Sequence, residues 1–244
     1  MRTIVPVILS LALLALPCFA ESVTVTVGEQ PPLFSRSGGI VDRTIGRALA
    51  AAGYEVAFEW LPIGRMLALL QQDSLGAYVT ASNTPGQHNP HVDFLEARGV
   101  FFYKKARFPA LKAERLEDLA GYRVATVVNS PNTPLFQKAG LLVDEGPYDT
   151  WFTKLDIGRV DFLATADVAG ILTVKALFPG REAEFTFTDL SYSTIRAGLY
   201  AKDNPALLAA ARAGFAAIRA DGTLDAMLLD FFGQENWRRV RIVK

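Results

Sequence analysis

The alternation of strand and helix patterns near the start of the chain constrains its fold most strongly. Apolar side chains alternate with polar ones over 23–27 and again over 56–60, which predicts two strands. Between them, one apolar face predicts a helix that Asp42 caps and Gly53 ends, and Pro62 opens a second helix. Strand–helix–strand–helix order is typical of a parallel sheet covered by helices. We therefore expect an α/β fold.

The rest of the chain continues this alternation. Further strands are expected at 76–80, 100–103, 122–128, 160–164, 185–188 and 195–200, and further helices at 116–121, 135–139, 166–177, 205–221 and 223–232. Two polar segments, 81–87 and 129–134, each follow a predicted strand. Loops at the carboxyl ends of parallel strands are the usual ligand-binding positions in α/β proteins, so both segments are candidate binding loops.

The first 20 residues have the layout of a secretory signal. A positive start at Arg2 precedes the apolar run 4–16, and small residues at Cys18 and Ala20 fit a cleavage site after Ala20. The apolar run is short for a bilayer span. An uncleaved anchor and lipidation of Cys18 are the alternatives, and Pro17 fits lipidation poorly. We expect export to a periplasm.

Composition narrows the chemistry of the processed chain. Cys18 is the only cysteine, so cleavage after Ala20 would leave neither a disulfide nor a thiol. The chain has 25 Lys+Arg and 25 Asp+Glu, and loss of Arg2 would leave 24 against 25, a net charge of −1. That balance argues against nucleic acid or an anionic membrane as the partner. His88 and His91 flank Pro90 and lack a metal-binding motif, so we expect neither a metal nor another cofactor.

Four short motifs together resemble one known family. The first two, in chain order, are Pro32 with Gly39-Ile40-Val41-Asp42, and the stretch 118–125 (DLAGYRVA). The third is Gly158-Arg159-Val160-Asp161 with the later acidic residue Asp167, and the fourth is 204–233, which runs from Asn-Pro to Phe-Phe-Gly. Their order and spacing resemble the extracellular solute-binding proteins of bacterial ABC importers, polar amino-acid-binding class (family 3). The resemblance extends over nearly the whole chain after residue 20.

The resemblance implies a two-lobed periplasmic binding protein fold (type II), in which each lobe is a sheet flanked by helices. Lobe one would comprise 21–107 plus 193–244, and lobe two 108–192. The chain would cross between the lobes near 104–108 and 188–193. In this family the ligand lies in the cleft, and the lobes close on it by a hinge.

The resemblance also implies where a ligand carboxylate would bind. Family members hold it with the arginine of a Thr-x-x-Arg segment, because a guanidinium donates two parallel hydrogen bonds. The matching segment here begins at Thr84 and has Gln87 at the arginine position, with Ser82 in the same loop. Gln87 can donate an amide hydrogen bond but carries no charge, so either the ligand lacks an α-carboxylate or another cation replaces the clamp. Gln87 could also merely end a surface loop. Arg65 is the candidate replacement cation, with a solvent-facing role as the alternative.

Other candidate ligand contacts lie in both halves of the chain. The resemblance assigns the ligand's ammonium group to Asp167, which alternatively caps the following helix. Ser130, Asn132 and Thr133 could donate hydrogen bonds to an anionic group, or could serve only as turn and cap residues. Phe34, in a loop after two prolines, could stack on the ligand.

The function implied is capture of a small polar ligand, an amino acid or related amine or carboxylate, by a monomer that serves an ABC permease. A sensor module that reports to a membrane receptor would have the same sequence features. A dehydratase-like enzyme on the same fold is the other alternative, although the sequence contains neither a Gly-x-Ser-x-Gly motif nor a P-loop. We therefore expect a binding protein and not an enzyme.

The signal layout predicts how the chain is processed. Expressed in a bacterium, the protein should appear in a detergent-free periplasmic extract with Glu21 as its first residue. N-terminal sequencing and intact mass measure this outcome. A mass that includes an acyl group on Cys18 would contradict it.

Overall fold

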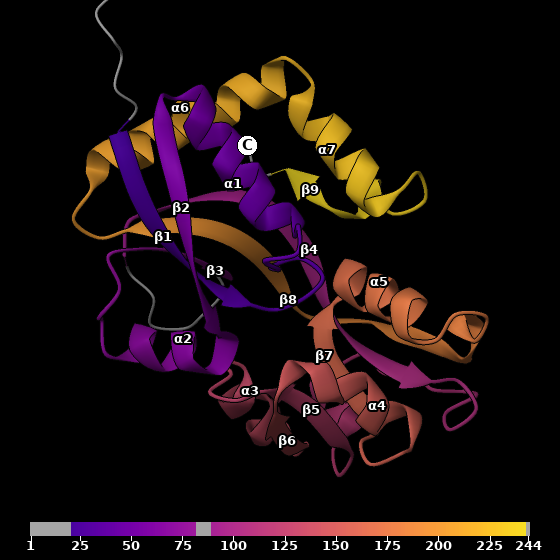
Figure 1. Ribbon diagram of the computed structural model, residues 1–244. Coiled ribbons are helices and arrows are strands. Elements are labelled where there is room, and N and C mark those ends of the chain that lie inside the picture. The colour runs from indigo at the N-terminus through magenta and orange to yellow at the C-terminus, as the bar shows by residue number, and fades with distance from the viewer. Residues whose placement is uncertain (1–20, 82–88, 243–244) are drawn as a thin grey trace, which may run out of the picture.

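The computed structural model describes residues 21–81 and 89–242 and contains one mixed sheet of nine strands in the order β2-β1-β3-β8-β4-β7-β5-β6, with β9 paired to β4 (Figure 1). The strands are β1 (Glu21–Glu29), β2 (Tyr54–Pro62), β3 (Ala77–Ala81), β4 (His91–Lys104), β5 (Arg123–Val127), β6 (Leu142–Gly146), β7 (Phe162–Ala166), β8 (Phe185–Ala201) and β9 (Arg241–Ile242). β1 pairs in parallel with β2 and β3, and β5 pairs in parallel with β6 and β7. The pairs that involve β4 or β8 are antiparallel.

The helices gather at the two ends of this sheet. They are α1 (Ile40–Ala51), α2 (Ile63–Gln71), α3 (Thr133–Lys138), α4 (Trp151–Asp156), α5 (Asp167–Leu177), α6 (Pro205–Ala220) and α7 (Thr223–Phe232). In Figure 1, α1, α6 and α7 lie together at the top, and α3 and α4 lie at the bottom with β5 and β6. Over the described residues, no helix is both long enough and apolar enough to cross a membrane.

Two separate hydrophobic regions define two lobes. The core of the first lobe includes Val25, Ile45 and Phe215, and the second lobe is built around β5 and β7. Within β4, Leu95 belongs to the first core while Val100 and later residues pack in the second lobe. The predicted α/β class and two-lobed fold are therefore confirmed. The lobe boundaries proposed from the sequence stay a prediction. Along β4, the residues change from the first core to the second a few positions before residue 104, where the predicted crossing begins.

Two strands are much longer than their sequence patterns predict. β4 has 14 residues where only 100–103 was expected, and β8 unites 185–188 with 195–200 in one strand of 17 residues. Register shifts between β4 and β8, one of them at Gly99/Val100, interrupt the alternation of apolar positions. The interrupted pattern hid the continuity of both strands. β6, α4 and β9 were also not predicted.

The predicted helix cap at Asp42 is wrong. α1 begins at Ile40 with Gly39 as its N-cap in extended conformation, so Asp42 lies within the first turn. A Cβ on Gly39 would be 2.4 Å from the Leu33 carbonyl oxygen and 2.6 Å from the Ser35 nitrogen. The backbone of the preceding loop is therefore packed directly against the start of α1, and only glycine fits there.

The close approach of α1 and α6 yields a stability prediction. A Cβ on Gly214 of α6 would be 1.9 Å from the carbonyl oxygen of Ala48 in α1, so Gly214→Ala should force the helices apart and lower the free energy of unfolding by about 2–4 kcal/mol. Gly46→Ala is the matched control, because its nearest neighbour would be the Phe58 ring at 3.7 Å. That change should leave stability unchanged or raise it by about 0.5–1 kcal/mol. Urea denaturation of both variants measures the difference, and equal effects would contradict the packing argument.

Candidate ligand-binding cleft

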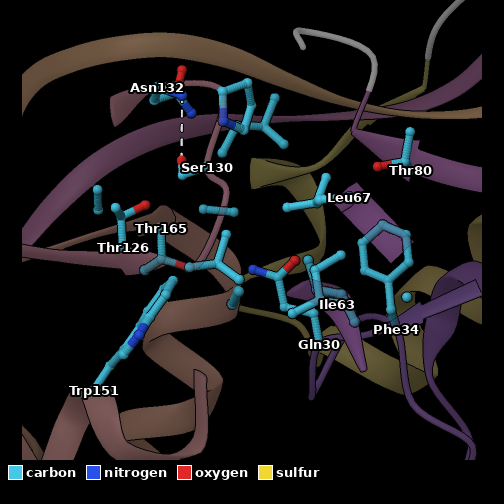
Figure 2. Close-up of a pocket in the computed structure, with 18 of the residues that line it drawn as sticks. Gln30, Phe34, Ile63, Leu67, Thr80, Thr126, Ser130, Asn132, Trp151 and Thr165 are labelled. Carbon is cyan, nitrogen blue, oxygen red and sulfur yellow. Dashed lines mark hydrogen bonds between the residues drawn. The ribbon is translucent and has the colours of Figure 1, made fainter. Parts of the chain in front are cut away.

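The carboxyl ends of β1, β3, β5 and β7 meet around one cavity of about 100 Å³. Residues of both lobes line it: Gly28, Gln30, Leu33, Phe34, Ile63, Leu67, Val79 and Thr80 come from the first part of the chain, and Thr126, Val127, Ser130, Pro131, Asn132, Trp151, Ala164, Thr165, Ala166, Ala169, Tyr192 and Ile195 from later parts (Figure 2). Strand ends in α/β sheets leave backbone and side-chain groups free for a ligand. The cavity is therefore the candidate site.

The polar groups of this cavity are uncharged. Thr80, Thr126 and Thr165 are each buried, with 4%, 3% and 3% of their surface exposed. In Figure 2 the amide of Gln30 points toward the side that Thr165 lines. Among the side chains that the structure describes, no Asp, Glu, Lys or Arg lines this cavity. Burial also raises the pKa of Tyr192, so its phenol is neutral at ordinary pH. The walls can therefore exchange neutral hydrogen bonds with a ligand.

The apolar part of the lining is fixed by backbone contacts. Phe34 exchanges two backbone hydrogen bonds with Gln30, at 2.8 and 3.1 Å, which fold the proline-containing segment between them into a tight loop. A Cβ on Gly28 would be 2.5 Å from the Ile63 Cδ1 atom, so glycine at this position lets α2 approach β1. Across the cavity, Trp151 donates its indole N–H to the Gly146 carbonyl at 3.2 Å. Its polar atom is thereby satisfied within the second lobe.

Three of the predicted contacts line the cavity: Phe34, Ser130 and Asn132. The Ser130 hydroxyl accepts the Asn132 backbone N–H at 3.3 Å, which holds the loop after β5 in a turn. Thr133 is not part of the lining, and its hydroxyl donates to the Glu145 carboxylate at 2.5 Å. Ser82, Thr84 and Gln87 lie outside the described residues. Their assignments stay predictions.

Arg65 and Asp167 both lie away from this cavity. Arg65 is exposed and lines a second, larger cavity beside the first. Asp167 is buried at the start of α5, where it accepts the Val168 backbone N–H at 2.8 Å. Burial raises the pKa of Asp167, and the nearby cations Arg98 and Arg239 oppose that shift. The role of Asp167 in binding an ammonium group stays a prediction, and the cavity-facing positions beside it are Thr165 and Ala166.

Sequence reasoning missed the threonines and the glutamine of the lining. Thr80, Thr126 and Thr165 each occupy the next-to-last position of a strand, and Gln30 directly follows β1. A polar residue at the carboxyl end of an otherwise apolar parallel strand is the signal that could have identified them.

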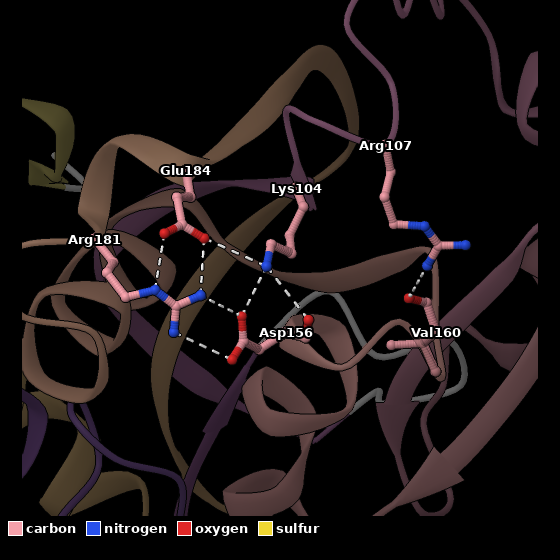
Figure 3. A network of polar contacts seen from close by, with 6 residues as sticks. All are labelled: Lys104, Arg107, Asp156, Val160, Arg181 and Glu184. Atoms are coloured by element: carbon pink, nitrogen blue, oxygen red, sulfur yellow. Dashed lines mark hydrogen bonds and ion pairs between the residues drawn. The ribbon is translucent and has the colours of Figure 1, made fainter.

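An ion-pair network supports the second lobe (Figure 3). The Lys104 ammonium at the end of β4 lies 2.9 Å from Asp156 and 3.3 Å from Glu184. The Arg181 guanidinium lies 2.8 Å from each of the same two carboxylates. Contact with Arg181 lowers the pKa of Glu184 to about 2, and contacts with Arg181 and Lys104 lower that of Asp156. The network joins the end of β4, the end of α4 and the start of β8.

Within the described part of the chain, no group of three or more histidine, aspartate or glutamate side chains could hold a metal ion. His91 instead stacks on Tyr200, with ring centroids 4.6 Å apart. Its ring therefore packs within the first lobe.

Comparison with known proteins places this geometry in a structural context. No family model matches the chain, and no curated protein does. Among solved structures, an ancestral arginine-binding protein bound to arginine is 22% identical, with a TM-score of 0.69 over 88% of this chain and 100% of that one. The GluR0 ligand-binding core from Nostoc punctiforme in complex with L-glutamate is 12% identical, with a TM-score of 0.70 over 86% and 99%. The substrate-binding protein of an amino acid ABC transporter is 16% identical, with a TM-score of 0.66 over 87% and 100%.

The chain shares the fold of these two-lobed binding proteins. The similarity covers nearly all of the described residues and the full length of the neighbours. At identities of 12–22% it establishes the fold, and the ligand must be inferred from this chain's own residues.

A buried carboxylate supports the loop that holds Phe34. Asp42 is 8% exposed and packs against the Ser35–Gly39 turn. Burial raises its pKa from 3.8 to about 6, and the nearby backbone N–H groups of Asp42 and Ser35 and the Arg43 cation only partly offset that shift. In the folded protein Asp42 is therefore protonated at a pH where the unfolded chain has already ionised it.

This shift predicts a pH dependence of stability. A carboxyl with a raised folded-state pKa stabilises the fold at low pH, and its contribution is lost as pH rises from about 4 to above 6, by about 2–3 kcal/mol. Asp42→Asn cannot ionise, so its free energy of unfolding relative to the parent protein should rise by that amount between pH 4 and pH 7.5. Chemical denaturation at both pH values measures this, with Asp225→Asn at an exposed position of α7 as the control. A difference that does not change with pH would show that Asp42 is not the responsible group.

Proposed function

We propose that this protein is an exported solute-binding protein that captures a small polar molecule, an amino acid or related amine or carboxylate, between its lobes and delivers it to an ABC permease. The observation that supports this most directly is the cavity itself, because Gln30, Phe34 and Thr80 line it from the first lobe and Thr126 and Thr165 from the second. A ligand there would contact both lobes at once. Binding without chemical turnover is part of the proposal.

The connections between the lobes suit a hinge. β4 and β8 run through both lobes, and their pairing shifts register near Gly99. Across the mouth of the cleft, the Asn129 amide donates to the Gly64 carbonyl oxygen at 3.3 Å. A single hydrogen bond of this kind is worth about 1 kcal/mol, so a ligand that contacts both walls can readily shift the balance toward closure.

The neutral walls constrain the ligand. An ion enclosed among uncharged groups loses hydration that such groups repay poorly. The enclosed part of the ligand should therefore be an uncharged polar group, and any carboxylate should extend to a cation at the edge of the cleft. Arg65 is the candidate cation, since it follows Ile63 by two residues and lines the adjoining cavity that Ile63 also lines.

A ligand screen with matched variants tests the proposal. Thermal shift against amino acids, amines, organic acids and sugars should identify a ligand, because binding only the folded state raises its stability. Thr126→Val, which removes one buried hydroxyl, should weaken binding about tenfold by calorimetry, and Thr153→Val, at an exposed position of α4, should not. Arg65→Gln should weaken carboxylate ligands selectively. Asp167→Asn should weaken ligands that carry an ammonium group, and an unchanged affinity would contradict the role predicted for Asp167 from the sequence.

Scattering provides the second measurement. Saturation with the ligand should reduce the radius of gyration, because closure brings the lobes together. Failure of every compound class to bind would contradict the proposed function. Binding with an unchanged scattering profile would leave capture in place and contradict the hinge.

A further inference from the structure

A second cavity of about 840 Å³ adjoins the first and is roughly eight times larger than its 100 Å³. Ile63 and Val127 line both cavities, so the two spaces share a wall. From the first lobe it is lined by Glu29, Pro31, Pro32, Pro62, Gly64 and Arg65. The second lobe contributes mainly apolar groups, among them Val128, Phe152 and Leu172.

The apolar lining of this larger cavity is partly open to solvent. Leu177 and Val128 are 51% and 40% exposed, and both lie on it. Tyr148 and Phe152, which are buried, form part of its second-lobe wall. Apolar surface of this kind, concave and contributed by both lobes, is stabilised when an apolar group displaces the water from it.

Only two side chains with formal charge line the larger cavity, counted over the residues that the structure describes, and they are not equivalent. Glu29 is already paired, with its carboxylate 3.2 Å from the Arg36 guanidinium. Arg65 has no carboxylate of the described chain within ion-pair distance, and it is exposed at the cavity. A ligand complementary to this site would therefore have an apolar body and one anionic group.

We propose that the captured solute is a carboxylate with an extended apolar body, which fills the larger cavity while its carboxylate pairs with Arg65. This inference rests on the proposed function and specifies the class of its ligand. A guanidinium offers a carboxylate two parallel hydrogen bonds, and at the edge of an apolar cavity these are less screened than in bulk water. The apolar body supplies affinity in proportion to the surface that it buries.

A homologous series of ligands measures both contributions. Calorimetry with butanoate, hexanoate and octanoate should show an affinity gain of about three- to fourfold per added methylene. Octanamide, which lacks the charge, should bind about tenfold more weakly than octanoate. Arg65→Gln should abolish that difference between acid and amide, and Arg47→Gln, at an exposed position of α1, should preserve it.

A cavity-filling variant locates the apolar body. Ala176 is exposed on α5 and lines the larger cavity, so Ala176→Trp can occupy the space without disturbing the core. It should weaken octanoate at least tenfold and leave butanoate nearly unchanged. Ala216→Trp on the exposed face of α6 is the matched control. Should Ala176→Trp fail to fold, the chain-length series on the parent protein still decides the question.

The outcomes separate this inference from the proposed function. Affinity that rises with chain length and depends on Arg65 supports the inference. The inference is overturned if affinity does not change with the chain length of the ligand, or if Ala176→Trp leaves the affinity for octanoate unchanged. If short polar solutes still bind in that case and Thr126→Val weakens their binding, the proposed function is retained and only the inferred ligand class is rejected. If no solute binds at all, both are overturned.

Discussion

The antiparallel pairing of β4 with β8 is the constraint on which the rest of the structure depends. These strands run side by side from the first core to the second and contribute residues to both lobes. Because the pairing shifts register near Gly99, the same ladder that joins the lobes is also bent where they meet. The position of the cleft follows from this arrangement, since β3 pairs with β8 on one side and β7 pairs with β4 on the other.

Cavity and scaffold are built from different kinds of residue. The scaffold depends on large buried groups, such as the stacked rings of Phe94 and Phe215, whose centroids lie 4.8 Å apart. The cavity depends on small hydroxyls at strand ends and on a few apolar side chains held from behind by backbone contacts. Among the described side chains, no Asp, Glu, Lys or Arg lines the smaller cavity, and Arg65 lines the larger one. A fold of this kind can change its ligand without altering its core.

Much of the fold was predictable because its periodicity is regular. Strand and helix patterns gave the order of most elements, and motif order gave the two-lobed architecture. The long strands escaped prediction, since bulges break the period of two on which the pattern depends. The site was predicted only in part. Phe34, Ser130 and Asn132 line the cavity, but Thr126 and Thr165 look like ordinary strand residues, and Arg65 and Asp167 needed coordinates to place them.

The closeness of Gly28 to Ile63 has a consequence for how such a protein diversifies. Ile63 lines both cavities and so forms part of the wall between them. Because position 28 is glycine, this wall can lie close to β1. A methyl group added at position 28 would displace the Ile63 side chain and change how the space is divided between the two cavities. A single substitution at position 28 in the first strand would therefore change which ligands fit, without replacing any side chain that lines either cavity.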